Sequence, residues 1–357
     1  GDRCDVLVAM NAAALKMQYR HCKPNGTIII DTDSFGAKDL QKAEFRSDDY
    51  LGEMGIDPDR VVACPITKMV KECLGLVCWL FNRDLSLVDS FLEAKFKKKP
   101  AVAEANKRVV RAGYDYGHNV HASVPNTYRI ESKVKEAGRY MDITGNKATA
   151  YGLMAAAEKA GLRLFLGSYP ITPATDILHE LAKHKSMGVT TVQCEDEIAG
   201  CASAIGAAFA GALAATSTSG PGICLKSEAI NLALIDELPL VIIDVQRGGP
   251  STGLPTKSEQ TDLLQVLYGR NGESPMPVIA ATSPTDCFDA AYHACKIALE
   301  HMTPVVLLTD AFIANGSSAW KLPNIEELPE IHPHYATEEQ KYKYTPYKRN
   351  PETLARY

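Results

Sequence analysis

The sequence predicts a protein of the α/β class with two domains. The chain has 357 residues, which exceeds the usual length of one domain. Short apolar, β-branched runs alternate with helical patterns, as in parallel sheets whose strands are joined by helices. In the second half, each apolar run ends in a turn and a helix follows directly. That pattern is typical of a doubly wound sheet, which binds ligands at the carboxyl ends of its strands.

The first predicted domain covers residues 1–117 and a predicted linker covers 118–140. The strand signals of this domain are DVLVAM, GTIIIDT and RVVACPI. Its helix signals are NAAALKMQYRHC, residues 68–81, VDSFLEAKFKKK and AVAEANKRVVRAGYDYG. The segment that follows is polar and irregular, as expected of a crossing between domains.

The second predicted domain covers residues 141–322. It opens with a loop and an alanine-rich helix, DITGNKATAYGLMAAAEKAG. Strand, turn and helix signals then recur in LRLFLGSYPITPATDILHELAKH, TTVQCEDEIAGCASAIGAAFAGA and LAATSTSGPGICLKSEAINLALIDE. The strands LPLVIIDV, PVIAATS and TPVVLLTDA complete the sheet. Residues 323–357 are polar and proline-punctuated, and we predict a connector or tail there.

Composition argues against several partners and locations. The net charge is −5, and no Lys/Arg cluster is interleaved with aromatic residues, so we expect no nucleic-acid partner. The ten cysteines are dispersed, without a C-x-x-C pair. This pattern favours reduced thiols, as in a cytoplasmic protein. It also predicts no metal or iron–sulfur site on this chain. Residues 198–215 approach the length of a membrane span, but they are mostly Ala, Gly and Ser and lack flanking aromatic or basic residues. We expect no membrane span.

Loops after successive strands should meet at one edge of the second sheet. The first of four candidate loops, GSYPITPATD, favours a helix start with Thr172 as N-cap and Pro173 at the first helical position. A compatible interpretation is that the hydroxyls of Tyr169 and Thr172 lie beside the positive end of that helix, where an anion is stabilised. Local chemistry alone favours the helix start.

The second loop places an acidic triplet, EDE, before a helix rich in glycine and alanine. The helix dipole alone would favour carboxylates there. However, Gly200, Gly206 and Gly211 in a helix interior each cost about 1 kcal/mol relative to alanine. Small residues also recur every four positions, which lets another backbone approach closely. We therefore expect the carboxylate at the head of this helix to lie at a tight, dry junction, where burial favours a protonated carboxyl group.

The third and fourth loops follow the next two strands. TSTSGPGICLKS contains Gly220 and Pro221; it fits a tight turn and a ligand-binding loop equally well, and it lacks the phosphate fingerprints. In RGGPSTGLPTKSEQTD, Arg247 is by default a solvated charge at a strand end. Alternatively, Gly248 and Gly249 expose its guanidinium, which can bind a carboxylate through two hydrogen bonds.

Together these loops resemble the pyrimidine-side domain of thiamine diphosphate enzymes, in which a glutamate leads a Gly/Ala-rich helix and a strand ends in a T-S-G-P-G turn. YPITP and QRGGPSTGLPTKSEQTDLLQ look like the alpha subunit of the 2-oxoacid:ferredoxin oxidoreductases, particularly the 2-oxoglutarate branch. DVLVAMNAAALK and GTIIIDTDS are similar to the gamma domain fused ahead of the alpha domain. The implied fold is a gamma-type α/β domain followed by a doubly wound, thiamine-diphosphate pyrimidine-type domain.

This resemblance assigns Glu197 the bond to the aminopyrimidine of thiamine diphosphate, with Gly220 and Pro221 also at the cofactor. It implies oxidative decarboxylation of 2-oxoglutarate to succinyl-CoA, with electrons passing to ferredoxin.

The same resemblance assigns the substrate carboxylate to Arg247. It implies that the Thr172 hydroxyl bonds to the 2-oxoacid head and that Thr256 lies near the same pocket.

The sequence lacks the G-D-G…N motif and clustered cysteines that the family carries on a beta subunit. The resemblance therefore implies that Mg²⁺ and a [4Fe–4S] cluster belong to the beta subunit, that this chain supplies half of the active site, and that the complex is a heterotetramer. The glycine-rich turn that opens a gamma domain is missing as well, and both ends look truncated. We therefore expect the chain to be a fragment.

Other interpretations stay open. The same type of complex could act on pyruvate, branched-chain or aryl 2-oxoacids. The chain could instead be a non-catalytic scaffold subunit, although the presence of Glu197, Thr172 and Arg247 argues against that. A nucleotide-binding module is disfavoured by the missing phosphate fingerprints.

Overall fold

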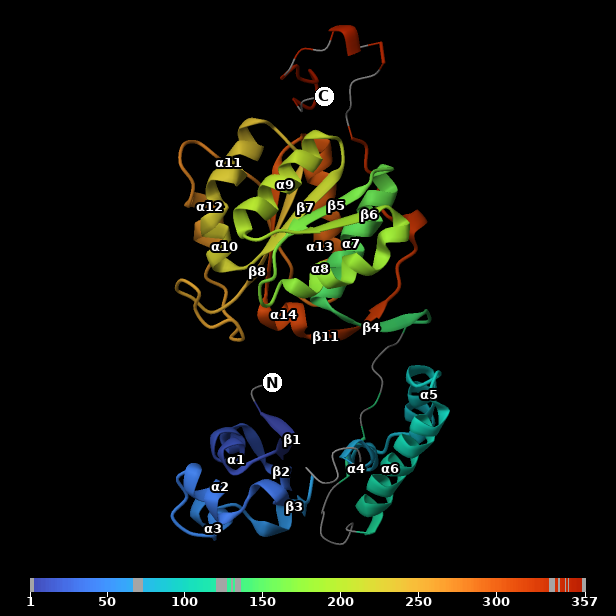
Figure 1. Cartoon of the computed structure of the whole chain (residues 1–357), viewed down its shortest axis with the longest axis vertical. Helices are drawn as coiled ribbons and strands as arrows, with labels where there is room; N and C mark the ends of the chain where they lie inside the picture. The colour runs from blue at the N-terminus through green and yellow to red at the C-terminus, as the bar shows by residue number, and fades with distance from the viewer. Residues whose placement is uncertain are drawn as a thin grey trace. The chain divides into compact units, whose positions relative to one another are not determined.

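The computed structural model divides into two compact units, residues 1–135 and 136–357 (Figure 1). It describes residues 3–66, 73–119, 127–129, 131, 136–333, 338–339, 341–343, 345 and 347–354. The start of the helix predicted over 68–81, much of the predicted linker and parts of the predicted tail lie outside the described residues. The boundaries at residues 117, 140 and 322 stay predictions.

The first unit is built on a parallel sheet of order β1-β2-β3. Its strands are β1 (Cys4–Ala9), β2 (Cys22–Asp31) and β3 (Val61–Cys64). Its described helices are α1 (Ala12–Gln18), α2 (Ala37–Lys42), α3 (Tyr50–Met54), α4 (Cys73–Leu80), α5 (Leu85–Lys95) and α6 (Pro100–Asn119). The central strand is apolar on both faces because Ile29 packs with Trp79 of α4, whereas Ile28 and Ile30 pack with Leu15 of α1.

The second unit contains a parallel sheet of order β6-β5-β7-β8-β10-β9. The strands are β5 (Leu164–Ser168), β6 (Val189–Gln193), β7 (Leu213–Thr218), β8 (Leu240–Gln246), β9 (Val278–Ala280) and β10 (Pro304–Asp310). The chain runs outward from β5 to β6 and then returns to place β7 on the other side of β5. This reversal is the topological switch point at which doubly wound sheets bind ligands, so the predicted fold class is confirmed.

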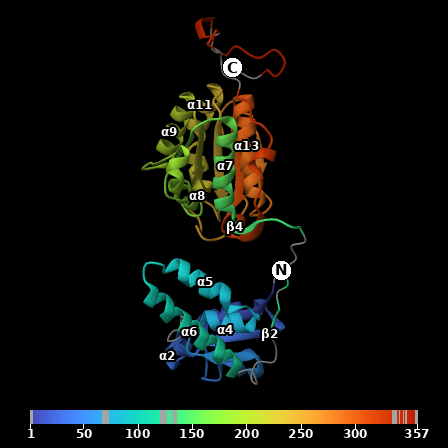
Figure 2. The same cartoon turned by 90° about the vertical axis from the view of Figure 1, so that its right-hand side faces the viewer.

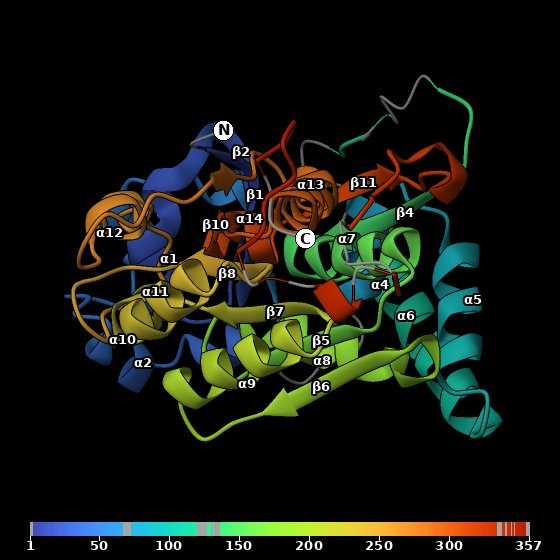
Figure 3. The same cartoon turned by 90° about the horizontal axis from the view of Figure 1, so that it is seen from above.

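Helices cover both faces of this sheet. They are α7 (Gly145–Ala160), α8 (Thr175–Leu181), α9 (Glu197–Phe209), α10 (Gly220–Leu225), α11 (Ser227–Ile235), α12 (Leu263–Tyr268), α13 (Asp286–His301) and α14 (Ala311–Asn315). Figures 2 and 3 show α7 and α13 on one side of the strands and α9 and α11 on the other. Alternation along β8 separates the two cores, because Ile243 packs with α7 and α13 whereas Ile242 packs with α9 and α11.

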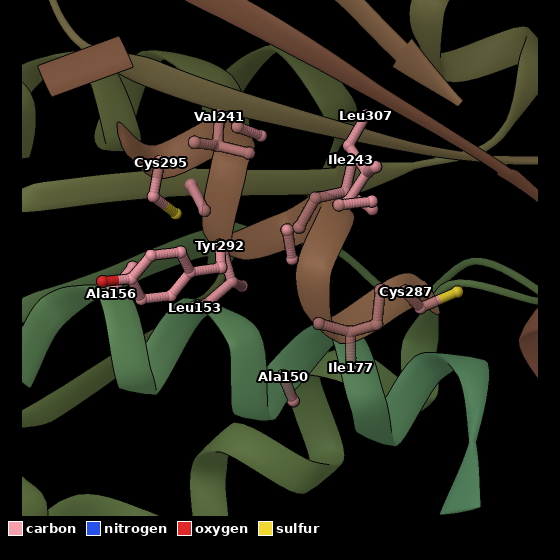
Figure 4. Packing of buried hydrophobic residues seen from close by; sticks show 14 of the residues in the cluster. Ala150, Leu153, Ala156, Ile177, Val241, Ile243, Cys287, Tyr292, Cys295 and Leu307 are labelled. Atoms are coloured by element: carbon pink, nitrogen blue, oxygen red, sulfur yellow. The ribbon is translucent and has the colours of Figure 1, made fainter. Parts of the chain in front are cut away.

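The core between the sheet and α7 and α13 is close-packed (Figure 4). The two helices approach so closely that a Cβ on Gly152 would lie 2.4 Å from the carbonyl oxygen of Phe288. Leu153 and Tyr292 fill the space between these helices and the strands, where Val241 and Leu307 meet them. Each fully buried side chain of this size stabilises the fold by about 1.5–3 kcal/mol, so this core holds the strand ends rigidly in place.

A small antiparallel sheet was not predicted. It pairs β4 (Tyr140–Thr144) with β11 (Ser317–Lys321), two segments far apart in the sequence. The prediction of a loop at DITGN is therefore wrong, because the first residues of this segment belong to β4. Neither segment has a strong apolar alternation, and each becomes a strand because the other supplies its hydrogen-bond partners.

The apolar segment 198–215 is divided between a helix and a strand. Helix α9 ends at Phe209, and β7 begins at Leu213. Gly211 lies beyond the end of the helix, so the prediction that it occupies the helix interior is wrong. Its φ of +87° is in the left-handed region, which glycine adopts readily in a turn. In the part of the chain that the structure describes, no helix is long and apolar enough to cross a membrane.

Candidate functional site

The predicted site residues follow strands that are neighbours in the second sheet. Tyr169 and Thr172 follow β5, Glu197 opens α9 after β6, Gly220 opens α10 after β7, and Arg247 follows β8. Because all these strands are parallel, their carboxyl ends share one edge of the sheet. The fold thus brings the four loops together, as the sequence predicts.

Glu197 is the first residue of α9 and is half-buried. The cap of this helix is Asp196, whose side chain accepts a hydrogen bond from Ala199 N at 2.8 Å, which leaves Glu197 free for another role. The hydroxyl of Tyr169 donates a short hydrogen bond to Glu197 Oε1. Burial, and then the bond to Glu197, raises the pKa of Tyr169, so the phenol keeps its proton at neutral pH. The hydrogen bond between Tyr169 and Glu197 was not predicted from the sequence.

Small residues bring the backbone of α9 onto β5. A Cβ on Gly200 would lie 3.2 Å from Ser168 Cα, and one on Gly167 would lie 2.4 Å from the carbonyl oxygen of Gly200. The predicted close approach is therefore confirmed at Gly200, whereas Gly206 faces open space. The position of Glu197 is fixed by this contact, because any larger residue would push the head of α9 away from the strand.

The T-S-G-P-G turn lies against Glu197. Strand β7 ends at Thr218 and α10 begins at Gly220, with Pro221 in its first turn. A Cβ on Gly222 would lie 3.0 Å from Glu197 Cγ and 1.9 Å from Thr218 Oγ1. Glycine is therefore required at residue 222 for the turn to fit beside the glutamate, and both Gly220 and Pro221 are only partly buried.

Arg247 is enclosed by its own loop. Its Nη1 donates to the carbonyl oxygen of Thr172 at 2.7 Å and its Nη2 donates to that of Thr252 at 2.8 Å. The side chain is only 7% exposed, so the expectation that glycines expose the guanidinium is wrong. Its Nε is buried, and the described residues offer it no hydrogen-bond acceptor. Arginine has five N–H donors, so donors are left for a bound anion.

The glycines after Arg247 fold the loop back on itself. Gly248 N donates to the carbonyl oxygen of Lys257 at 2.9 Å, and Gly249 N donates to Glu259 Oε2 at 2.8 Å. Gly253 has a φ of +55°, and a Cβ there would lie 1.9 Å from the carbonyl oxygen of Gly248. Glycine is needed here for the close approach of two backbone segments, which then cover Arg247.

Thr172 lies beside Arg247 but does not cap a helix. Helix α8 begins at Thr175 after a turn in which Thr175 Oγ1 accepts from Ile171 N at 2.8 Å. The predicted N-cap at Thr172 and helical position of Pro173 are therefore wrong, because the threonine one helical turn later makes the local hydrogen bonds. The exposed side chain of Thr172 leaves its hydroxyl accessible, while its carbonyl oxygen holds Arg247.

Thr256 is exposed in the loop that covers Arg247. The described contacts do not join its side chain to Arg247 or Thr172, although the backbone of the next residue, Lys257, accepts the bond from Gly248. The fold therefore brings Glu197, Tyr169, Arg247 and Thr172 together, and Thr256 lies exposed on the loop that covers Arg247.

Sequence analysis also missed a polar cluster behind the turn, formed by the buried residues Thr216, Lys226 and Asp244 and the half-buried Asp262. Lys226 is fully buried, and its Nζ donates to Thr216 Oγ1 at 2.8 Å. Asp244 is likewise fully buried. The available signal was the aspartate inside the apolar run LPLVIIDV, which lies two residues after Ile242, a core residue on the same face of the strand.

The arrangement pairs an acid–base group with an anion-binding group. A carboxyl group such as that of Glu197 can accept and donate a proton while Tyr169 orients it, and a guanidinium such as that of Arg247, whose charge acts on Tyr169, can bind a carboxylate. Among the described residues, no group of three or more His, Cys, Asp or Glu side chains is placed to hold a metal ion. The geometry is that of a site that orients a small anion beside a proton-transfer group.

Comparison with known proteins places the chain in a protein class that binds thiamine diphosphate. Residues 155–356 match the family described as pyruvate flavodoxin/ferredoxin oxidoreductase, thiamine diphosphate-binding. Residues 1–116 match the family described as pyruvate ferredoxin/flavodoxin oxidoreductase. The chain therefore belongs to the pyruvate ferredoxin/flavodoxin oxidoreductase family.

The names of individual relatives are more specific about the substrate than the family descriptions are. The chain is 48% identical, over its whole length and 57% of the relative, to the 2-oxoglutarate oxidoreductase subunit KorA of Mycobacterium tuberculosis. It is 42% identical, over 52% of this chain and 53% of the relative, to the 2-oxoglutarate synthase subunit KorA of Archaeoglobus fulgidus.

A solved structure covers both units. The 2-oxoglutarate:ferredoxin oxidoreductase from Magnetococcus marinus, with 2-oxoglutarate, coenzyme A and succinyl-CoA bound, has a TM-score of 0.81 and 29% identity. The match covers 99% of this chain and 60% of the solved chain. The chain thus spans somewhat more than half the length of these relatives.

Proposed function

We propose that the chain is the alpha-type subunit of a 2-oxoacid:ferredoxin oxidoreductase that converts 2-oxoglutarate and coenzyme A to succinyl-CoA. The observation that carries this proposal is the placement of the Tyr169–Glu197 pair next to Arg247 and Thr172 at the switch point of the sheet. The names of the relatives and the solved structure support the same substrate.

The residues present fit the aminopyrimidine ring of thiamine diphosphate. Tyr169 uses Glu197 Oε1, and the described contacts give Oε2 no hydrogen bond, so that oxygen is available to a ring nitrogen. When bound, the cofactor supplies a carbanion at its thiazolium ring that attacks a keto group. In this proposal the Glu197 carboxyl group would hold a proton at the ring nitrogen through Oε2, with Gly220 and Pro221 beside the ring. Tyr169 orients the carboxyl group.

Arg247 is proposed to bind a carboxylate of the substrate. Its two bonds to the carbonyl oxygens of Thr172 and Thr252 fix the plane of the guanidinium before substrate arrives. The buried Nε has no acceptor among the described residues, and a bound anion would supply one. The exposed hydroxyls of Thr172 and Thr256 would complete the pocket around the 2-oxoacid.

A beta subunit is proposed to cover the outer face of α9 and α11. This face exposes large apolar side chains: Phe209 is 81% exposed, Ile235 71% and Ile198 49%. Such a surface favours burial against another protein. Because Ile198 follows Glu197 directly, the same contact would exclude water from the glutamate. In this proposal the beta subunit holds the diphosphate, Mg²⁺ and the [4Fe–4S] cluster, passes electrons to ferredoxin and completes a heterotetramer.

The cysteines support a reducing, cytoplasmic setting for the complex. Every cysteine whose side chain the structure describes is free. Burial raises the pKa of the Cys201 thiol to about 11, so it stays protonated and unreactive at neutral pH.

The proposal is tested by reconstitution. The chain, combined with its beta subunit, thiamine diphosphate, Mg²⁺ and coenzyme A, should reduce ferredoxin with 2-oxoglutarate. We expect kcat/KM for 2-oxoglutarate to exceed that for pyruvate, branched-chain or aryl 2-oxoacids by about 100-fold or more, since those acids lack the distal carboxylate. The chain alone should bind thiamine diphosphate poorly. A preference for another acid would correct the substrate, and a lack of activity with every acid would favour a scaffold subunit.

The subunit face is tested by replacing Phe209 with aspartate. A charge within an apolar interface should weaken assembly by about 30-fold or more, because the carboxylate must be desolvated. Affinity for the beta subunit would be measured by analytical ultracentrifugation. Met187→Asp is the matched control, since Met187 is 65% exposed and lies outside this face, on the segment that follows α8. Equal affinity of the Phe209→Asp variant and the wild type would remove this face from the proposal.

A further inference from the structure

Asp244 lies inside the second unit, on the face of β8 that packs with α9 and α11. Side chains alternate along the strand, so Leu240 and Ile242 belong to this core and Asp244 follows them on the same face. Its sheet neighbours are Thr218 on β7 and Leu308 on β10. Asp244 is 0% exposed, and a carboxyl group in such surroundings is strongly destabilised unless it has a hydrogen-bond partner.

The partner available to Asp244 is another acid. Neither carboxyl oxygen of Asp244 accepts a hydrogen bond from a donor of the described residues. Asp262 Oδ2 is also buried and likewise accepts no hydrogen bond from these residues. Asp262 Oδ1 accepts a bond from the Thr261 hydroxyl at 3.3 Å. The bond from Asp262 N to Gln246 Oε1, two residues after Asp244 on the same face of β8, holds Asp262 beside this strand, and the charges of the two carboxyl groups act on each other. Two carboxylates in contact inside a protein do not both ionise, and one proton between them makes one group a donor and the other an acceptor.

We propose that Asp244 and Asp262 share one proton, and that this carboxyl clasp fastens the start of α12 to β8 and positions the turn at Gly220. The backbone supports the same connection, because Asp262 N donates to Gln246 Oε1 at 3.0 Å. A Cβ on Gly220 would lie 3.0 Å from Asp262 Oδ2, so the clasp lies directly against the turn that borders Glu197. Both aspartates are thus positioning residues.

The cation nearest to the clasp does not replace the proton. Lys226 donates its hydrogen bond to Thr216 rather than to Asp244, and burial lowers its pKa. The other titratable groups that face the clasp are Cys224 of α10 and Glu259 of the loop before α12. Burial, and then Asp262, raises the pKa of Asp244 well above its usual value. Burial also raises the pKa of Asp262.

The clasp makes stability depend on pH in a defined direction. In the unfolded chain an aspartate has a pKa of about 3.9, and in the folded chain the shared proton is lost only at higher pH. The contribution of the clasp to stability is therefore complete in acid, below the unfolded pKa, and is lost as pH rises through the folded-state pKa.

Thermal unfolding of the full chain from mildly acidic to mildly alkaline pH tests this proposal. In Asp244→Asn the amide donates permanently to the Asp262 carboxylate, so the variant should gain stability relative to wild type by roughly 3 °C in Tm for each pH unit over the range in which the clasp loses its proton. Asp262→Ala should lower Tm at every pH and increase hydrogen exchange at α12 and at Gly220. Asp176→Asn, at an exposed aspartate on α8, is the control and should retain the wild-type profile.

A direct measurement on the wild type does not depend on any variant folding. The infrared difference spectrum between wild type and Asp244→Asn at neutral pH should contain the carbonyl band of one protonated carboxylic acid, present in the wild type and lost in the variant. Absence of this band from the wild type, or an unchanged pH profile in a folded Asp244→Asn variant, would overturn the proposal. Neither readout requires thiamine diphosphate or a partner subunit, so a negative result leaves the proposed function in place.

Discussion

Replacing Glu197 with glutamine should lower kcat of the assembled complex by about 100- to 10,000-fold. Glutamine retains the size of the side chain and can still accept the bond from Tyr169, but it carries no proton that can be exchanged with the ring nitrogen of the cofactor. The complex should therefore assemble and bind thiamine diphosphate while exchange of the C2 proton becomes slow. That exchange can be followed by NMR after acid quenching in deuterated water, separately from turnover.

Two further variants show whether the loss belongs to this carboxyl group. Glu195→Gln makes the same substitution at an exposed neighbour and should leave C2 exchange unchanged. Tyr169→Phe keeps the carboxyl group but removes the bond that orients it, so an intermediate loss of kcat is expected. Wild-type exchange in the Glu197→Gln complex would refute the assignment of Glu197, whatever the effect on assembly.

Replacing Arg247 with alanine should lower kcat/KM for 2-oxoglutarate by about 100-fold or more, while affinity for thiamine diphosphate changes little. The guanidinium is enclosed, so its charge acts on a bound carboxylate with little screening by solvent. The loss should be much smaller for a 2-oxoacid without a distal carboxylate if Arg247 binds that group. Steady-state kinetics with 2-oxoglutarate and pyruvate would measure this difference.

Controls must separate substrate binding from loop stability, because Arg247 also holds the carbonyl oxygens of Thr172 and Thr252. Arg247→Lys keeps the charge but not the planar set of donors, so it should recover only part of the activity. Lys257→Ala removes an exposed positive charge from the same loop and should retain wild-type kinetics. If Arg247→Ala had an unchanged KM and an intact loop by hydrogen exchange, the carboxylate assignment would be lost.

Local patterns were enough to predict the second sheet. Runs such as LPLVIIDV and TPVVLLTDA bury both faces of their strands, and turns with helix starts follow them directly. Strand β4 could not be predicted in this way, because its stability comes from pairing with β11, a segment at the other end of the unit. A pairing between distant segments leaves no local periodicity when neither segment is strongly apolar.

The candidate site could be predicted as a set of loops but not as a set of contacts. The motifs YPITP, EDE, T-S-G-P-G and RGG each follow a parallel strand, so their meeting at one edge follows from the strand pattern. The strand pattern did not predict three features of the site: the Tyr169–Glu197 bond, the enclosure of Arg247 and the start of α8 at Thr175. Each depends on a side chain or backbone group delivered by an element that is not its neighbour in the sequence.

The sequence alone determined the α/β class, the order of the strands along the chain and the residues available for acid–base chemistry and anion binding. These depend on hydrophobic periodicity and on turn residues, which act over a few neighbouring positions. Only the tertiary structure decided which groups are buried together, as at Arg247 with Thr172 and at Asp244 with Asp262. Burial is a property of packing between distant segments, and in a water-poor interior it determines whether a charged or polar group must find a partner.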